Sequence, residues 1–486
     1  MGNVLGNLQP KRIWEIFEEI ANIPRPSKFE GKIIEYAKKF GENLGLPTRV
    51  DEVGNVYISK PATKGMENRK GIILQAHMDM VPQKNSDVVH NFETDPIKPR
   101  IVDGWVKATG TTLGGDNGIG VATALAVLEA KDLVHGPIEV LLTIDEETGM
   151  TGAFGLKPGI LKGDILMNLD SEDEGQLFIG CAGGSNANAK FTYKEVDVPA
   201  GMAAFKISVK GLKGGHSGCD IQLGRGNSNK IMFRVLYDAS RNLGMRLASI
   251  DGGNLRNAIP REAIAEVVVP KGKAEEFKKL VMNFNDTVKS EYSTADPDVT
   301  ITAEPCEMPK KLIDETTQKN LIYAIYGCPN GVRRMSTEMP GLVETSSSLA
   351  IVKSGNGEII MQALIRSSVD SAKFSVENMF RCVFELAGAE INFDGQYSGW
   401  KPNPDSLILK EMTLSYEKLF GTKPEIMAIH AGLECGIIGG VYPNLDMISF
   451  GPTVKHPHSP DEAVEISTVE KFWEYMKDSL KNVPKK

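Results

Sequence analysis

The sequence predicts an α/β domain that is split in the chain by an inserted α+β domain. Helical and strand-like segments alternate up to about residue 195, the pattern changes between about 205 and 393, and the alternation then resumes. The length of 486 residues also exceeds the roughly 250 to 300 at which one hydrophobic core stops growing. We therefore expect residues 1–195 and 396–486 to form one domain, with helices flanking a mixed sheet, and residues 196–395 to form the inserted domain.

Two helices begin the first part, and strands follow them. Apolar residues recur at helical spacing over residues 11–23, which end at the prolines of IPRPS, and again over residues 29–44. The runs NVYIS and GIILQA are typical of strands, and a helix at GIGVATALAVLEA precedes further strands at IEVLLTI and ILMNL. Strands this continuously apolar are buried on both faces, so helical crossovers are expected between them.

The inserted part has longer strand-like runs, interleaved with helical stretches. The runs are FKISVKG, AIAEVVVP and EIIMQALIRSS, and the helical stretches lie near residues 228–243, 273–290 and 371–387. Residues 291–312 and KPATKGMENRK are expected to be solvated loops. After the insertion, a helix near residues 405–419 and the strand DMISFG return to the α/β pattern.

Composition and charge exclude several classes of function. Hydrophobic residues make up 41% of the chain and charged residues 24%, the balance of an ordinary globular protein. The formal net charge of -8 and the lack of a basic run argue against a nucleic-acid partner, so we expect a small-molecule substrate. Without a signal pattern or an apolar run of about 18 residues, no membrane association and a cytoplasmic location are expected. Six scattered cysteines without a CxxC pair favour reduced thiols.

Acidic and histidine side chains stand at the ends of three predicted strands. His77 follows GIILQA, Glu146 follows IEVLLTI, and Asp170 ends ILMNLD. Open α/β sheets place their ligands at the carboxyl edge of the strands, so these side chains are expected to face a ligand site.

Histidine nitrogen and carboxylate oxygen are the ligands that catalytic zinc takes, which makes His77 a candidate. An isolated histidine between methionines is more often a core residue, but Asp79 can accept the second ring N–H, as partners of metal-binding histidines do. Asp116 lies among glycines in LGGDNGIG, where a helix cap is the alternative to a metal ligand.

The remaining candidates are also ambiguous one by one. Glu146 and Glu147 adjoin a third carboxylate, and such a group needs cations or water to offset its repulsion, so a solvated turn is the alternative. Asp170 could belong to an acidic surface loop. The segment TVKHPHSPDE offers His456 and His458, and spacing does not say which of them would bind a metal.

Taken in order, HMDMVP, GGDNG, DEETG, NLDSED, GGHSG and HSPDE resemble the dizinc peptidase superfamily that includes carnosinases, aminoacylases and tripeptidases. The resemblance spans nearly the whole chain. IPRPS, LGGDNGIG, GCAGG and HAGLECG are most similar to the aminoacyl-histidine dipeptidases, also called cytosolic non-specific dipeptidases or peptidase D.

This resemblance implies a role for each candidate near the strand ends. It implies five ligands for two Zn²⁺ ions, with Co²⁺ or Mn²⁺ as substitutes: His77 and Asp170 on one ion, Glu147 and His458 on the other, and Asp116 bridging both. Glu146 becomes the general base, and Asp79 orients His77. In relatives a water held between two such metals attacks the scissile bond, and the base takes its proton.

The inserted domain would act as a lid that contributes to the same reaction. The resemblance implies that His216 in KGGHSG stabilises the oxyanion, although a turn histidine is the alternative. Asn257 in RNAIP and Arg366 in LIRSS match positions that hold the terminal carboxylate of the substrate, and Gly432 in HAGLECG gives backbone contact. For Arg366 a surface salt bridge is the alternative.

The expected function is hydrolysis of dipeptides with broad specificity, including Xaa-His substrates such as carnosine. An N-acyl amino acid amidohydrolase or a tripeptidase of the same superfamily is the close alternative, and a non-catalytic binding homologue is the alternative from a different class. The resemblance also implies a homodimer formed through the inserted domain.

Overall fold

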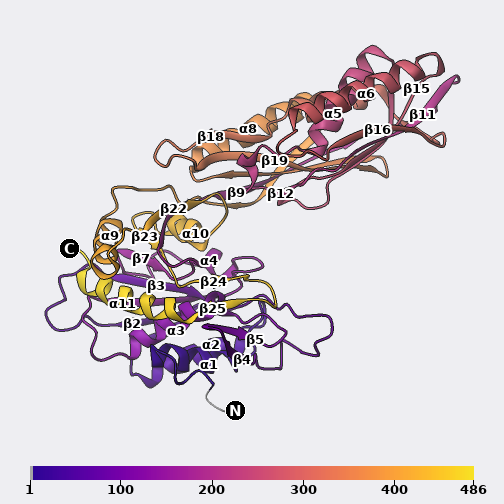
Figure 1. The fold of residues 1–486 in the computed structure, drawn as a ribbon. Coiled ribbons are helices and arrows are strands. Elements are labelled where there is room, and N and C mark those ends of the chain that lie inside the picture. Colours follow the sequence, from indigo (N-terminus) through magenta and orange to yellow (C-terminus); the bar gives the residue numbers. More distant parts are fainter. Residues whose placement is uncertain (1–3) are drawn as a thin grey trace. The chain divides into compact units, whose positions relative to one another are not determined.

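The computed structural model describes residues 4–486, and the chain divides into two compact units (Figure 1). Unit 1 contains the residues up to Gly180 together with Pro402–Ala428 and Leu433–Lys486. Unit 2 contains Cys181–Lys401 and the short segment Ile429–Gly432. The α/β class with an inserted α+β part, expected from the sequence, is confirmed.

Unit 1 is built on a mixed eight-stranded sheet. In spatial order its strands are β1 (Thr48–Val50), β2 (Val56–Lys60), β6 (Ile138–Thr143), β3 (Ile72–His77), β7 (Ile165–Asn168), β23 (Asp446–Ser449), β8 (Gln176–Cys181) and β22 (Glu425–Ile429). The central strands β6, β3, β7 and β23 run parallel to one another, whereas β1, β2 and β8 pair antiparallel with their neighbours. Every residue of β3 and of β7 is buried, as the continuous apolar runs predicted.

Helices and a small second sheet complete unit 1. The helices are α1 (Lys11–Ala21), α2 (Gly31–Asn43), α3 (Gly115–Glu129), α4 (Thr151–Phe154), α9 (Leu407–Phe420), α10 (Glu434–Val441) and α11 (Ile466–Asn482). α3 packs against α1 and β3, and α11 packs against α9. The second sheet has the order β24 (Val454–Lys455), β25 (Ala463–Glu465), β5 (Trp105–Ala108) and β4 (Pro99–Val102). It joins the C-terminal part of the chain to the segment that precedes α3.

Unit 2 is an antiparallel sheet with four α-helices. The sheet has the order β16 (Thr300–Pro305), β11 (Met202–Lys210), β15 (Ala263–Pro270), β13 (Arg246–Gly252), β19 (Val343–Gly355), β20 (Glu358–Ser367), β9 (Gly183–Thr192) and β21 (Glu390–Tyr397), and β18 (Gly331–Met335) pairs with β19. The helices are α5 (Ser228–Asn242), α6 (Ala274–Glu291), α7 (Glu315–Gly327) and α8 (Asp370–Leu386). Two short pairs also form: β10 (Glu195–Val196) with β17 (Leu312–Ile313), and β12 (Gly215–His216) with β14 (Ala258–Ile259).

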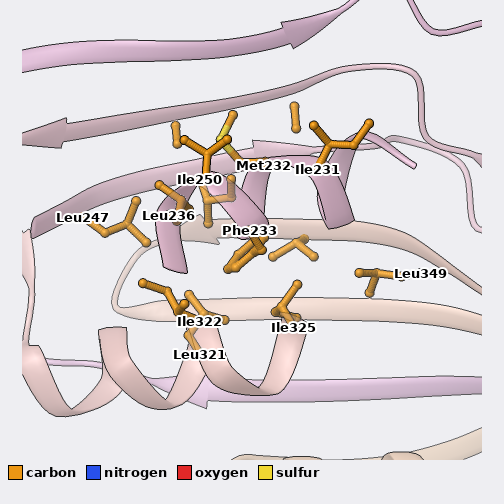
Figure 2. Packing of buried hydrophobic residues seen from close by; sticks show 14 of the residues in the cluster. Ile231, Met232, Phe233, Leu236, Leu247, Ile250, Leu321, Ile322, Ile325 and Leu349 are labelled. Atoms are coloured by element: carbon orange, nitrogen blue, oxygen red, sulfur yellow. The ribbon is translucent and has the colours of Figure 1, made fainter. Parts of the chain in front are cut away.

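The core of unit 2 lies between its helices and one face of the sheet. Figure 2 shows Phe233 and Leu236 of α5 in the same buried cluster as Ile322 and Ile325 of α7. These four side chains are fully buried, and the burial of each one stabilises the folded state by about 1.5–3 kcal/mol. Unit 2 therefore has its own hydrophobic core.

Two sequence expectations differ from the structure in detail. β9 pairs with β20 and β21, so unit 2 begins before residue 196, where the sequence placed the boundary. The expected loop at residues 291–312 contains β16, which pairs with β11. That expectation was wrong because an edge strand buries little: in β16 only Ile301 is fully buried, so its apolar pattern is weak. No helix in residues 4–486 is both long and apolar enough to span a membrane.

Candidate metal site and a cationic cluster

The carboxyl edge of the parallel strands gathers the residues that the sequence singled out. His77 is the last residue of β3 and pairs in register with Thr143, the last residue of β6. The turn that follows β6 carries Glu146 and Glu147. Asp170 follows β7 by two residues. Because β3, β6 and β7 are parallel neighbours, these turns leave the sheet at one edge.

Asp116 and His458 reach this edge from other segments. Asp116 lies at the start of α3, and the peptide bond between Asp116 and Asn117 is cis. His458 lies in the turn between β24 and β25 and has a positive φ of 60°. The neighbouring His456 belongs to none of the described groups that could hold a metal, whereas His458 does.

The five candidate ligands form two groups that share Asp116. The Nε2 atom of His77 lies 3.0 Å from Oδ1 of Asp116 and 3.3 Å from Oδ1 of Asp170. The Nε2 atom of His458 lies 3.3 Å from Oδ2 of Asp116 and 2.9 Å from Oε2 of Glu147. Each oxygen of the Asp116 carboxylate therefore faces a different histidine and a different second carboxylate.

The chemistry of these donors fits metal ions. Three carboxylates converge with two imidazoles, which is the nitrogen and oxygen set that zinc takes. Burial, together with the charges of Asp116 and Glu147, raises the pKa of Asp170 to about 6, although His77 opposes the rise. Oε1 of Glu147 is buried without a hydrogen-bond partner among the described residues. A divalent cation would both offset the repulsion and satisfy such an oxygen.

Asp79 connects His77 to the turn that carries the glutamates. It is fully buried, and its Oδ1 atom lies 3.2 Å from Nδ1 of His77. Its carboxylate also accepts the backbone N–H groups of Glu146 and Glu147, at 3.1 and 3.3 Å, and the hydroxyl of Ser27 at 2.7 Å. Although burial opposes ionisation, these partners lower the pKa of Asp79 to about 2. Asp79 is thus ionised and lies beside the ring nitrogen that a carboxylate partner of a metal-binding histidine would face.

Burial and neighbouring charges shift the pKa values of Glu146 and His77. Burial raises the pKa of Glu146 well above its usual range, and the charges of Asp170, Glu434 and Glu147 act in the same direction. Burial lowers the pKa of His77, but Asp170 and Asp116 outweigh it and raise the net value. A carboxyl group with a raised pKa suits proton transfer near neutral pH.

Glu434 is a functional candidate to which sequence reasoning assigned no role. It is the first residue of α10 and is 1% exposed, and its Oε2 atom accepts from Nε2 of Gln75 at 2.6 Å and from Oγ1 of Thr143 at 2.8 Å. Burial raises the pKa of Glu434 to about 7. Its only signal in the sequence was its place in HAGLECG. Gln75, two residues before His77, was hidden inside an apolar strand.

Unit 2 has a separate cluster around His216 and Arg366. The Nδ1 atom of His216 accepts the backbone N–H groups of Gly218 at 3.2 Å and Cys219 at 3.0 Å, so the neutral ring carries its proton on Nε2. Burial and the charge of Arg366 lower the pKa of His216, which favours this neutral form. The turn thus positions the ring, and the turn reading and the catalytic reading of this histidine are compatible.

Arg366 is 5% exposed, so it is not a residue of a surface salt bridge. Its Nη2 atom lies 3.3 Å from Nε2 of His216, and its Nη1 atom lies 3.4 Å from the hydroxyl of Tyr397. Both Nη2 and Nε2 carry hydrogens, so neither can accept from the other, and Nε of Arg366 has no acceptor among the described residues. The cluster therefore has unused donors of the kind that bind a carboxylate or an oxyanion.

Asn257 and Gly432 lie beside this cluster within unit 2. The carbonyl of Asn257 accepts the N–H of Ser217 at 2.9 Å, and the next residue, Ala258, pairs with His216. A Cβ atom at Gly432 would lie 2.9 Å from the Tyr397 hydroxyl, so the close approach requires glycine. The structure thus brings the four residues predicted for unit 2 into one neighbourhood and adds Tyr397, which no sequence motif indicated.

Comparisons with known proteins place the chain in a family. A family model described as Peptidase family M20/M25/M40 matches residues 73–482. The chain is 45% identical over 482 residues to the cytosol non-specific dipeptidase of Escherichia coli (strain K12), covering 99% of both proteins. A crystal structure of aminoacylhistidine dipeptidase from Vibrio alginolyticus has a TM-score of 0.96 and 49% identity, covering 99% of this chain and 98% of the other. The structure of aminopeptidase PepT from Bacillus cereus, with a TM-score of 0.58, 17% identity and coverage of 98% and 99%, shares the fold. This chain is a member of peptidase family M20/M25/M40.

Proposed function

We propose that this protein is a dinuclear zinc dipeptidase of broad specificity that accepts Xaa-His substrates such as carnosine. One observation carries the proposal: the two oxygens of Asp116 face two different pairs of candidate ligands, His77 with Asp170 and Glu147 with His458. A carboxylate placed in this way suits a bridge between two ions. The names of the relatives from Escherichia coli and Vibrio alginolyticus support the dipeptide as substrate.

The proposed mechanism assigns a role to each side chain near the carboxyl edge. Bound at the five ligands, two Zn²⁺ ions would polarise the scissile carbonyl and activate a water molecule. Glu146 takes the proton of the attacking water and then donates it to the departing amine, so that one carboxyl group serves both halves of the hydrolysis. Asp79 keeps the ring of His77 in the tautomer that presents Nε2.

Unit 2 is proposed to bind the far end of the substrate as a lid. The Nε2–H of His216 would stabilise the negative charge that develops on the carbonyl oxygen. Arg366, with Asn257 and the backbone at Gly432, would hold the terminal carboxylate. The donors of Arg366 and His216 that lack acceptors in unit 2 support these roles.

A substrate panel tests the proposal directly. Metal-free protein is loaded with zinc, cobalt or manganese and assayed with free dipeptides, Xaa-His dipeptides, tripeptides and N-acetyl amino acids. Hydrolysis of free dipeptides that depends on added metal supports the proposal. Cleavage of N-acetyl amino acids without cleavage of dipeptides would instead show an amidohydrolase, and activity in metal-free protein would contradict the mechanism.

Location and assembly are also proposals. The description of the Escherichia coli relative as a cytosol enzyme supports a cytoplasmic location. A homodimer formed through unit 2 is supported by exposed apolar side chains on α8, among them Phe374, Met379 and Leu386. Sedimentation of the wild type and of Leu386→Glu measures the assembly. A dimer that the substitution dissociates supports the proposal, and a monomeric wild type contradicts it.

A further inference from the structure

The backbone that carries Asp116 is held from two sides by buried charged residues far away in the sequence. This segment, residues 113–116, is called the LGGD loop below. Glu462 contacts its N–H groups, and Arg25 contacts one of its carbonyls. Both side chains are 2% exposed. Arg25 belongs to IPRPS and Glu462 to HSPDE, two motifs with no function in the mechanism above beyond His458.

Glu462 accepts three hydrogen bonds from the LGGD loop. Its Oε2 atom accepts the N–H of Leu113 at 2.7 Å and of Gly114 at 2.9 Å, and its Oε1 atom accepts the N–H of Asp116 at 3.2 Å. The backbone N–H of Glu462 donates to the carbonyl of Ser459 at 3.0 Å, so the residue closes the same turn that carries His458. One turn therefore supplies a candidate ligand and also holds the backbone of the candidate bridging ligand.

Arg25 connects the LGGD loop to the segment that follows His77. Its Nη1 atom donates to the carbonyls of Met78 and Asp79, both at 2.8 Å, and its Nη2 atom donates to the carbonyl of Gly114 at 2.5 Å. Two residues further on, the hydroxyl of Ser27 donates to the Asp79 carboxylate at 2.7 Å. The IPRPS segment thus connects the backbone after His77 with the backbone before Asp116.

The glycines of LGGDNG are explained by this arrangement. Both backbone polar groups of Gly114 are hydrogen-bonded to a charged side chain: its N–H donates to Glu462, and its carbonyl accepts from Arg25. Gly114 has a positive φ of 70°, and a Cβ there would lie 2.4 Å from Nη2 of Arg25. A Cβ at Gly118 would lie 2.7 Å from the same atom, and one at Gly115 would lie 2.4 Å from Cγ2 of Val464. The two charged side chains can approach only because these side chains are absent.

Neither residue touches the atoms that would hold metal or substrate. The hydrogen bonds of Arg25 go to carbonyl oxygens, and those of Glu462 come from backbone N–H groups. Charged hydrogen bonds in a buried setting are short and directional, so they restrict the backbone more than neutral ones do. The effect of Glu462 on the site must pass through the position of the Asp116 backbone, and that of Arg25 through this backbone and the segment that follows His77.

We propose that Arg25 and Glu462 are positioning residues, which set the Asp116 carboxylate at the distance from His77 and His458 that lets it bridge two metal ions. The proposal rests on the proposed function for the two ions, but it concerns only residues of this chain. It predicts that metal affinity, and not merely folding, depends on both side chains.

Glu462→Gln is the sharpest variant. The amide oxygen can keep the bonds to Leu113 and Gly114, but the amide nitrogen would face the N–H of Asp116 and cannot accept it. We expect zinc affinity, measured by competition with a chromophoric chelator, to fall about tenfold to a hundredfold for at least one ion. The visible spectrum of the cobalt-loaded protein should change as well. With dipeptide, kcat should fall while KM changes by less than about threefold, because substrate contacts are intact.

Arg25→Lys and Glu377→Gln complete the experiment. Lysine keeps the charge at position 25 but lacks the planar fork whose two nitrogens reach the segment after His77 and the carbonyl of Gly114 separately, so a similar loss of metal affinity is expected. Glu377 is a buried carboxylate of unit 2, 7% exposed, that accepts from Gln396 at 3.0 Å, and its Gln variant should keep normal metal affinity. The melting temperature of each metal-free variant is recorded alongside.

Unchanged zinc affinity and cobalt spectra in Glu462→Gln and Arg25→Lys, with only a lower melting temperature, would overturn the proposal. Failure of both variants to fold would also overturn it, since the residues would then be merely structural. Because metal binding is measured without substrate, a wild type that binds two ions but does not cleave dipeptides would contradict the proposed function and still leave this inference testable.

Discussion

The Nε2 atom of His458 lies 2.9 Å from Oε2 of Glu147, in a half-exposed position between two carboxylates. Hydrogen bonds to Asp116 and Glu147 raise the pKa of His458 to about 11, and burial opposes this only in part. Without a metal, the imidazole therefore carries a proton at neutral pH. A histidine must lose this proton to bind a metal ion, so a bound cation would take the place of the proton.

Zinc binding should consequently release protons. We expect metal-free protein at pH 7.5 to bind two ions, with proton release measured in weakly buffered solution. His458→Ala should bind one ion fewer and release about one proton fewer. His456→Ala is the matched control, because His456 lies in the same turn but outside the metal-holding groups, and it should behave like the wild type. Equal stoichiometry in both variants would exclude His458 as a ligand.

Substitution of Glu146 by Gln should separate metal binding from turnover. The amide keeps the shape of the side chain but cannot accept a proton from water, so kcat should fall by about 10²–10⁴. Zinc content, measured by mass spectrometry, should remain that of the wild type, because Glu146 is not among the five proposed ligands. Glu147→Gln should instead lose metal. Near-normal activity of Glu146→Gln would refute the assignment of the base.

Recognition of the substrate carboxylate by Arg366 can be tested with dipeptide amides. The wild type should cleave the free dipeptide with a much higher kcat/KM than its C-terminal amide. In Arg366→Lys, which lacks the planar fork, the ratio of the two kcat/KM values should be about tenfold smaller. Metal content should not change. Arg381→Lys on the exposed face of α8 serves as the control. If Arg366→Lys discriminates the two substrates as the wild type does, another group binds the carboxylate.

The stability of the metal-free protein should depend on the ionisation of Glu434. Burial raises its pKa from 4.5 to about 7, so between these values the folded state keeps a proton that the unfolded state has lost. Stability from this group is therefore fully present below about pH 4.5 and is lost as the pH rises through 7. Glu434→Gln is neutral at every pH. Its melting temperature relative to that of the wild type should therefore rise by a few degrees as the pH rises from 5 to 8. The exposed Glu425→Gln provides the control, and a difference that does not change with pH would contradict the shift.

Many elements could be predicted because their signals are local. The continuous apolar runs of β3, β6 and β7 and the stripes of α1 and α5 match the structure to within one or two residues. β16 and α7 were not predicted, since neither has a strong apolar pattern. In α7 the start is marked only by the Asp314 side chain, which accepts the N–H of Thr317.

The sequence by itself determined the order of the domains, the strand ends that carry His77, Glu146 and Asp170, and, through its motifs, the family. These depend on burial patterns and residue types that lie close together in the chain. Spacing did not choose between His456 and His458, the family resemblance favoured His458, and the fold places His458 in a metal-holding group. The tertiary structure alone placed Arg25 and Glu462 around the LGGD loop. The partners of Arg25 lie 53 to 89 residues away and those of Glu462 lie 346 to 349 residues away, and a hydrogen bond between distant segments leaves no periodicity in the sequence. Only the folded chain brings donor and acceptor together.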